Sequence, residues 1–303
     1  IEEAPLVTKG LGRTDIGKQR KQNEDAFHVD NELGVFAVAD GMGGHSAGDL
    51  AAAIAIDAVT AALQSAHSVM EESRRESRDT MPLDWVVEDA VTKASAAVFQ
   101  RGSAEERLSG MGCTLTVLVA SGDRAVVAHV GDSRLYLVRD DRAVQLTTDH
   151  TLAQELASSG VIPQSEVHGH RLEHVLTRAV GVREDVRVDT RVLELLPGDR
   201  FLICSDGLSK YVDNPDWVAE RLGSADIEAV PESMIQHAND AGGRDNITVV
   251  VVDVAEDDAD LSRPVDITFE VLAHRVNRFA SALHAHGFGM GTGIATLTGR
   301  VPD

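Results

Sequence analysis

Four acidic pairs, each at the edge of a segment that reads as a β-strand, constrain most strongly how this chain can fold. The pairs are Glu24-Asp25, Asp40-Gly41, Asp206-Gly207 and Asp245-Asn246. If these strands end at one edge of a β core, the carboxylates gather there, and each raises the pKa of its neighbours unless cations neutralise them. Oxygen ligands without Cys or His at similar spacing suit hard ions such as Mg²⁺ or Mn²⁺ rather than zinc. The sequence therefore predicts a metal-dependent enzyme.

The composition is that of a globular protein and argues against several kinds of partner. The chain has 303 residues, 43% of them hydrophobic, and a formal net charge of -21. This charge repels nucleic acid and anionic lipid surfaces, so no nucleic-acid partner is expected. No unbroken apolar run of about 18 residues occurs, which predicts no membrane span. The two cysteines, Cys113 and Cys204, each lie in an apolar run. Such thiols are typical of a core in a reducing compartment, so we expect a cytoplasmic protein.

The order of the predicted elements favours an α+β fold. Apolar residues at helical spacing predict helices at 49–64, 84–101 and 226–239. Apolar runs bounded by turn residues predict strands at 34–40, 113–120, 124–130, 135–138, 188–195, 200–204 and 247–254. Residues 148–183 have weaker periodicity and are expected to form an irregular, partly helical insertion. Strands adjacent in sequence, with helices arriving in groups, favour layered α+β packing over a βαβ series.

Six motifs in order resemble those of one enzyme family. They are RKQNED at 20–25, VADGMGGHSAG at 38–48, GMGCT at 110–114, HVGDSR at 129–134, CSDGL at 204–208 and GRDNIT at 243–248. Together they resemble the metal-dependent protein serine/threonine phosphatases of the protein phosphatase 2C type, in wording close to bacterial members. The resemblance covers residues 8–254, with 148–183 as a flap-like insertion. It implies a four-layer α-β-β-α sandwich of two mainly antiparallel sheets, with a dimetal centre in the cleft between loops at the sheet edges.

The resemblance also implies a ligand set for two Mn²⁺ or Mg²⁺ ions. Asp40 would bridge both ions, and Gly41 would offer its backbone carbonyl to one of them. Asp206 and Asp245 would complete the shell of the first ion. Glu24 would bind the second.

Further matched residues would support this centre. Asp25 would orient metal-bound water, and Asn246 would be a supporting polar residue. Asp132, together with Asp206, would hold a third, weaker ion. Arg20 would bind the substrate phosphate, because a planar guanidinium can grip two phosphate oxygens at once and hold phosphorus in line for attack.

The chain departs from the family pattern at Met42, where animal relatives have a His that is a candidate general acid. The proton donor to the leaving alkoxide is therefore unassigned. His45 is the nearest alternative in sequence, and metal-bound water is its rival. A His in this loop could equally cap the following helix or face solvent.

These residues imply a phosphoserine/phosphothreonine protein phosphatase in which a metal-bridging hydroxide attacks phosphorus directly, without a phosphoenzyme. Its partners would be phosphorylated proteins and an opposing Ser/Thr kinase. Two alternatives stay open. One is a non-catalytic phosphatase-like binding module, which would lack a metal ligand or Arg20. The other is a metal-dependent phosphatase of small phosphate esters, which would differ only in its substrate.

A separate helix is predicted after an acidic linker at 255–264. Apolar residues share one stripe of the segment 265–286, namely Phe269, Leu272, Val276, Phe279 and Leu283. Because an exposed stripe with two phenylalanines favours association, we expect it to dock on the catalytic domain or on a second copy in a homodimer. Residues 287–303 are expected to be a flexible tail.

Overall fold

The structure is a computed structural model that describes residues 5–257, with gaps at 43–46, 68–82, 213 and 224–225. His45, the helix predicted at 265–286 and the tail at 287–303 lie outside the described residues, so the statements about them stay predictions. The described residues belong to one unit that ends at Asp257.

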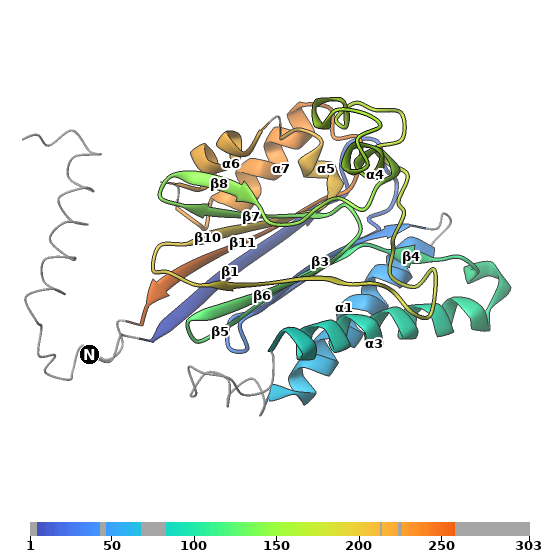
Figure 1. Cartoon of the computed structure of the whole chain (residues 1–303), viewed down its shortest axis with the longest axis horizontal. Coiled ribbons are helices and arrows are strands. Elements are labelled where there is room, and N and C mark those ends of the chain that lie inside the picture. Colours follow the sequence, from blue (N-terminus) through green and yellow to red (C-terminus); the bar gives the residue numbers. More distant parts are fainter. Residues whose placement is uncertain (1–4, 43–46, 68–82, 213, 224–225, 258–303) are drawn as a thin grey trace, which may run out of the picture. The chain divides into compact units, whose positions relative to one another are not determined.

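One sheet has five strands in the order β1-β11-β10-β7-β8 (Figure 1). These are β1 (Leu6–Asp15), β11 (Ile247–Glu256), β10 (Arg200–Cys204), β7 (Arg134–Arg139) and β8 (Arg142–Gln145). All neighbouring strands are antiparallel. The first and last strands pair along their whole length, from Leu6 opposite Glu256 to Asp15 opposite Ile247.

The second sheet has six strands, five of them in the order β2-β3-β5-β6-β9. These are β2 (Asp25–Asp30), β3 (Val35–Met42), β5 (Leu115–Ser121), β6 (Arg124–Val130) and β9 (Asp189–Glu194). The short strand β4 (Gly112–Cys113) pairs with the end of β3, with Cys113 opposite Gly41. Every pair is again antiparallel.

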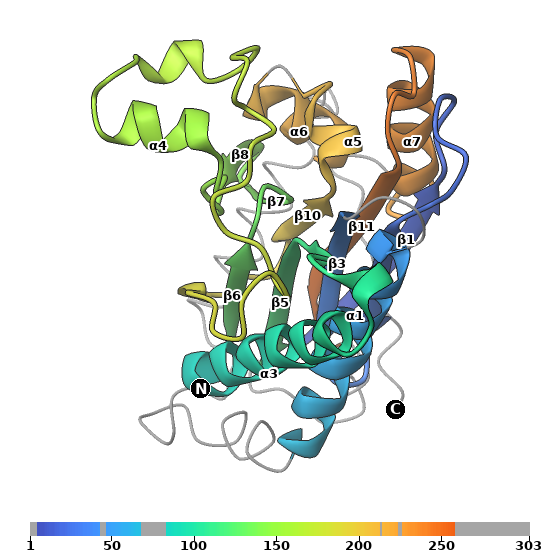
Figure 2. The same cartoon turned by 90° about the vertical axis from the view of Figure 1, so that its right-hand side faces the viewer.

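Helices cover the outer face of each sheet (Figures 1 and 2). The long helices α1 (Ala47–Ser65) and α3 (Leu83–Ala104) pack on the second sheet. The shorter helices α5 (Asp206–Ser209), α6 (Pro215–Leu222) and α7 (Val230–Asp240) pack on the first. Between β8 and β9 the chain forms α4 (Leu152–Ser158) and a 3-10 turn, η2 (Gln164–Glu166). A second such turn, η1 (Glu106–Leu108), follows α3.

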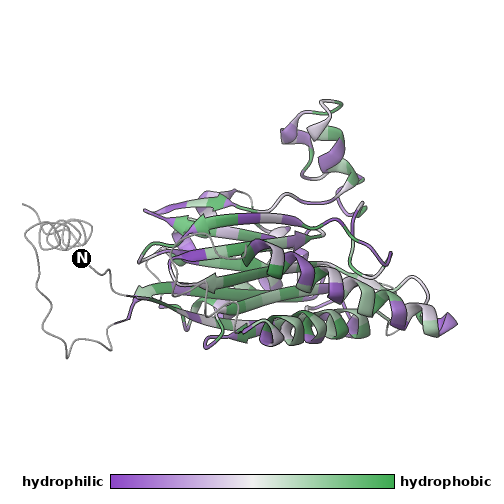
Figure 3. Cartoon of the chain, turned by 60° about the horizontal axis from the view of Figure 1, so that its bottom comes forward, coloured by the Kyte–Doolittle hydropathy of each residue, from purple (hydrophilic) through white to green (hydrophobic). Residues whose placement is uncertain are grey.

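The side chains of β3 point alternately into two hydrophobic cores, one on each face of the sheet. Val35, Ala37 and Ala39 pack with α1 and α3, whereas Phe36 and Val38 pack between the sheets. Successive side chains of a strand point to opposite faces, so a strand covered on both sides reads as an unbroken apolar run. Figure 3 shows that hydrophobic residues predominate along the stacked strands. Truncating the fully buried Phe36 to Ala would cost about 3–5 kcal/mol.

Among the described residues, α1 is the one helix long and apolar enough to cross a membrane. Length and composition alone do not decide its place, because the core helix of a globular protein has the same character. Its buried residues Ala51, Ala55 and Val59 pack in the cluster that also contains residues of β3 and α3. In this structure α1 is therefore a core helix.

The predicted α+β sandwich with its four layers is confirmed, and β6 and β10 have the predicted bounds. Several details differ. The strand predicted at 113–120 is divided into β4 and β5, and α7 begins at Val230 rather than at 226. Strands β1 and β8 and helix α6 were not predicted from the sequence, and the strand expected beside Glu24-Asp25, which is β2, was predicted without bounds. Ala255 and Glu256, which the sequence placed in the acidic linker, belong to β11.

Candidate active site

Strand ends from both sheets bring acidic residues to one edge of the sandwich. Asp25 begins β2 and lies opposite Asp40 near the end of β3. Asp206 follows β10, and Asp245 precedes β11, the neighbour of β10 in the other sheet. Burial, and then the charges of Asp25, Asp206, Asp132 and Asp245, raise the pKa of Asp40 well above its ordinary value. Acids from motifs far apart in the sequence thus surround Asp40.

Gly41 allows two chain segments to approach closely beside Asp40. Its backbone N donates to the backbone O of Glu24 at 3.1 Å. A Cβ at this position would lie 2.1 Å from the backbone O of Gly48 and 2.5 Å from that of Glu24. Any larger residue would push Glu24 away from Asp40, so this Gly is needed for the geometry of the site.

Thr114 fixes the backbone of Asp40. The backbone N of Asp40 donates to Thr114 Oγ1 at 2.9 Å, and the backbone N of Thr114 donates to the Asp40 carbonyl at 2.8 Å. Thr114 is itself buried, and its hydroxyl hydrogen-bonds Ser133 Oγ at 2.7 Å. The motif at 110–114 drew attention to this segment, but the role of its threonine becomes visible only in the structure.

Asp25 is a buried acid with one satisfied and one unsatisfied oxygen. Its Oδ2 accepts hydrogen bonds from Ser205 Oγ at 2.8 Å and Thr248 Oγ1 at 2.7 Å. Its Oδ1 is buried without a partner among the described residues. Burial raises the pKa of Asp25 to about 7, with smaller contributions from Asp206 and Asp245, while the two hydroxyls oppose the shift. An acceptor oxygen is therefore available for water or a cation.

Asn246 holds the loop that presents Glu24. Its Nδ2 donates to the backbone O atoms of Ile16 and Gln22, each at 2.9 Å, and its Oδ1 accepts from the backbone N of Glu24 at 2.9 Å. The side chain is nearly fully buried. These three bonds tie the start of β11 to the segment before β2, and the supporting role of Asn246 in a metal centre stays a prediction.

Asp132 lies in the turn between β6 and β7, at the border of the acidic group. It is buried, and burial, followed by the charges of Asp206 and Asp149, raises its pKa to about 8. The charges of Asp132 and Asp206 thus act on each other, and the third-ion site proposed for this pair stays a prediction.

Two basic side chains, Arg20 and Lys210, form ion pairs with acids of this group. Arg20 Nη2 lies 2.7 Å from Asp245 Oδ1, and its Nη1 lies 4.0 Å from Glu24 Oε2. Lys210 Nζ lies 2.7 Å from Asp206 Oδ2 and 3.3 Å from Asp245 Oδ2. Burial opposes the charge of Lys210, but the two carboxylates outweigh it and raise its pKa above the ordinary value. Lys210 was not singled out in the sequence, although its position four residues after Asp206 could have indicated a pair.

The residues present fit a site for hard cations. The buried Oδ1 of Asp206, like that of Asp25, has no partner among the described residues. Repulsion among the acids and an all-oxygen donor set both favour Mg²⁺ or Mn²⁺. Within the described ranges, no three His, Cys, Asp or Glu side chains already stand as closely as a bound ion requires. The predicted ligand assignment therefore stays a prediction.

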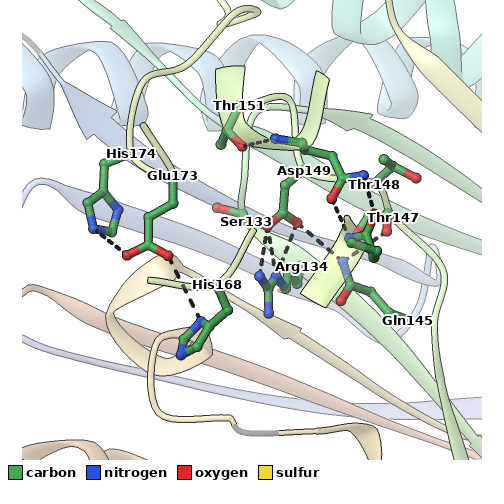
Figure 4. A network of polar contacts seen from close by, with 12 residues as sticks. Ser133, Arg134, Gln145, Thr147, Thr148, Asp149, Thr151, His168, Glu173 and His174 are labelled. Atoms are coloured by element: carbon green, nitrogen blue, oxygen red, sulfur yellow. Dashed lines mark hydrogen bonds and ion pairs between the residues drawn. The ribbon is translucent and has the colours of Figure 1, made fainter. Parts of the chain in front are cut away.

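Arg134, the last residue of the motif at 129–134, is occupied by a structural ion pair (Figure 4). Its Nη2 donates to Asp149 Oδ2 at 2.8 Å and its Nε donates to Asp149 Oδ1 at 3.1 Å. Gln145 Nε2 adds a bond to Asp149 Oδ1 at 3.2 Å. Arg134 therefore ties the end of β8 and the start of the predicted flap to β7. Figure 2 shows α4 of this flap beside β8, away from the stacked sheets.

Comparison with known proteins gives one consistent family. A family model described as Protein phosphatase 2C matches residues 12–247. The serine/threonine protein phosphatase PstP of Mycobacterium tuberculosis (strain H37Rv) is 35% identical over 260 residues, covering 86% of this chain and 48% of the relative. The serine/threonine phosphatase stp of Listeria innocua is 34% identical over 244 residues, covering 80% of this chain and 94% of the relative. The chain thus spans about half the length of the first relative.

Solved structures agree with this result. A crystal structure of the Mycobacterium tuberculosis serine/threonine phosphatase PstP/Ppp has a TM-score of 0.73 and 34% identity, covering 82% of this chain and 98% of that chain. A structure of the PstP catalytic domain in complex with two manganese ions has a TM-score of 0.70 and 34% identity, covering 82% and 99%.

Proposed function

Since the chain belongs to the protein phosphatase 2C family, whose members depend on metal ions, we propose that it hydrolyses phosphoserine and phosphothreonine in proteins. One observation supports this most directly. The acids around Asp40 come from both sheets and lie beside Arg20, whose guanidinium is within 2.7 Å of Asp245. A dense group of negative charge next to a partly exposed arginine is what a phosphate ester needs, once cations neutralise the acids.

We propose that two ions, Mn²⁺ or Mg²⁺, bind at this group. Asp40 would bridge them with Glu24 on one side and Asp206 and Asp245 on the other, and Gly41 would add its carbonyl. When bound, the ions would cancel the charge of the acids and of the phosphate and lower the pKa of water. A third, weaker ion would lie between Asp132 and Asp206, as the pKa effect of Asp206 on Asp132 suggests.

The chain's own residues would position the reacting groups. The unpartnered Oδ1 of Asp25 can accept a hydrogen bond from the attacking water, while Ser205 and Thr248 hold the other oxygen in place. Arg20 has a side chain that is 46% exposed, so its guanidinium can reach a phosphate outside the protein. Two donors on a planar group would fix the phosphoryl oxygens in line for direct attack without a phosphoenzyme.

The alternatives are separated by particular residues and by substrate. A non-catalytic binding module would be expected to lack a metal ligand or Arg20, and the chain has all of them. A phosphatase of small esters would use the same group and differ only in what reaches it. We further propose a cytoplasmic location, an opposing Ser/Thr kinase, and docking of 265–286 on this domain or on a second copy.

Hydrolysis of a phosphothreonine peptide with Mn²⁺, and then with excess chelator, tests the proposal. We expect phosphate release that requires the metal. We also expect at least about a tenfold preference over a matched phosphotyrosine peptide, because the tyrosine ring holds the phosphorus farther from the backbone of the substrate peptide than threonine does. Faster turnover of a small alkyl phosphate, such as free phosphothreonine, than of any phosphothreonine peptide, at equal concentration, would favour the small-ester alternative. Absence of turnover with intact Mn²⁺ binding would favour the binding module.

A further inference from the structure

Lys210 contacts two of the acids that the proposed metal centre needs. Its Nζ is 2.7 Å from Asp206 Oδ2 and 3.3 Å from Asp245 Oδ2. The ammonium group thus lies between carboxylates contributed by the ends of two neighbouring strands, β10 and β11. The ammonium group of Lys210 therefore supplies part of the positive charge that a bound metal ion would bring to these two carboxylates.

The position of Lys210 is set by its own backbone. It follows α5, and its N donates to the backbone O of Asp206 at 3.0 Å, which places the two side chains on one face of the turn. Its side chain is only 27% exposed, and those of Asp206 and Asp245 are 18% and 20% exposed. Water therefore screens this contact less than it screens a pair on the open surface.

Lys210 and a divalent ion would need the same oxygens. We propose that Lys210 is a built-in competitor for the metal: it weakens divalent ion binding at Asp206 and Asp245 and stabilises the folded site when ions are scarce. This inference rests on the proposed metal centre. For an ion to bind both oxygens, the ammonium must move away or leave one carboxylate, and this displacement subtracts from the affinity of the ion.

Arg20 does not do the same. In the part of the chain that the structure describes, its guanidinium lies 2.7 Å from Asp245 and 4.0 Å from Glu24 but forms no ion pair with Asp206, and its side chain is 46% exposed. It can turn outward to a phosphate and leave both carboxylates in place. The effect on metal affinity should therefore be larger for Lys210 than for Arg20.

A matched control lies elsewhere in the chain. Lys93 and Asp89 on α3 have the same spacing of four residues, with Nζ 2.6 Å from Asp89 Oδ2. Lys93 is 64% exposed, and its partner is outside the acidic group. Lys93→Gln thus removes an equal charge and an equal local contact at a distance from the site.

Calorimetric titration of the full chain with Mn²⁺, together with melting temperatures in chelator and in Mn²⁺, tests the inference. Lys210→Gln should bind Mn²⁺ about tenfold more tightly, as expected for the loss of a competing charge-assisted hydrogen bond. The melting temperature of Lys210→Gln should be below that of wild type in chelator and equal to it in saturating Mn²⁺. Lys210→Arg, which keeps the charge, should stay near wild type in chelator, and Lys93→Gln should leave Mn²⁺ affinity unchanged.

Other outcomes would overturn the inference. Unchanged or weaker Mn²⁺ binding by folded Lys210→Gln would mean that the lysine supports the site structurally and does not compete. If Lys210→Gln does not fold, Lys210→Arg tests the inference, because the forked guanidinium group of arginine can hold both carboxylates more firmly than lysine does. Weaker Mn²⁺ binding by Lys210→Arg, with a wild-type melting temperature in Mn²⁺, would support competition. Unchanged Mn²⁺ binding by Lys210→Arg would contradict competition. Asp206→Asn separates the two proposals. If it binds Mn²⁺ like wild type, the proposed metal centre itself is wrong.

Discussion

Replacing Asp25 by Asn should stabilise the protein in chelator at pH 8. The carboxyl is buried, its pKa is raised to about 7, and one oxygen has no partner among the described residues. A raised pKa means that the folded state binds the proton more tightly than the unfolded state. The stability that this group contributes is therefore complete below about pH 4 and is lost as pH rises to about 7.

The size of the effect follows from the shift. From its ordinary value of 3.8 to about 7, the ionised carboxylate costs the folded state on the order of 4 kcal/mol above pH 7. Asn keeps an oxygen that can accept the hydrogen bonds of Ser205 and Thr248. Asp25→Asn should therefore remove most of that cost at pH 8 and have little effect on stability at pH 4.

Chemical denaturation in chelator from pH 4 to pH 8.5 measures this directly. Asp89→Asn, in a surface pair on α3, is the control and should show the pH profile of wild type. Saturating Mn²⁺ should abolish the advantage of Asp25→Asn, because metal binding favours ionised acids and stabilises the native state. If Asp25→Asn gave the same decline in stability between pH 4 and pH 8 as wild type, the buried-charge account of this residue would be refuted.

Three further predictions concern the proposed centre. Asp40→Asn and Asp206→Asn should each reduce turnover of a phosphothreonine peptide at least about a hundredfold at saturating Mn²⁺, because each removes a charged ligand. Calorimetry should show weaker Mn²⁺ binding by both variants. Near-normal turnover of Asp40→Asn would contradict the bridging role of Asp40. Arg20→Ala should lower kcat/KM about ten- to a hundredfold, the range for charge-assisted hydrogen bonds, and change Mn²⁺ affinity less than Lys210→Gln does. A variant that lost Mn²⁺ binding would remove the case for a phosphate role. Asp132→Ala should lower turnover while calorimetry still detects the two tighter ions; loss of all ions would place Asp132 in the main ligand set.

The elements that could be predicted from the sequence are those whose local pattern agrees with their environment. β10 and β11 are covered on both faces, so their apolar runs marked them clearly. β1 was missed because Gly10 and Gly12 interrupt it, and glycine is unfavourable in a strand. The structure explains both glycines by close packing, since a Cβ would lie 2.3 Å from the Phe36 ring and 2.4 Å from the Phe27 ring.

Helix ends were predicted less well for a related reason. In α7 the helix begins at Val230, next to Pro231, which suits a first turn, whereas the apolar spacing continued further back. Helix α6 has Asn214 as its N-cap and Pro215 in the first turn, but its eight residues are too few for periodicity to stand out. Short helices depend on tertiary packing, which the local pattern does not contain.

The candidate site was predictable in its residue types and order but not in its internal pairing. Motif order indicated Asp40, Asp206 and Asp245, because acids at strand ends are visible in sequence. The contact of Lys210 with both Asp206 and Asp245 depends on β10 and β11 being neighbours. That adjacency joins residues about 40 positions apart and is a property of the sheet.

The place of β11 in its sheet has a consequence for synthesis of the chain on the ribosome. The last described strand lies between β1 and β10, with Leu6 opposite Glu256 on one side and Arg200 opposite Asp253 on the other. Until residues 247–256 leave the exit tunnel, β1 has no neighbouring strand in its sheet, and the position between β1 and β10 is unfilled. Contacts so distant in sequence form late and slowly. The nascent domain must therefore keep two unpaired strand edges from other chains for most of its synthesis, because such edges readily pair with strands of other chains.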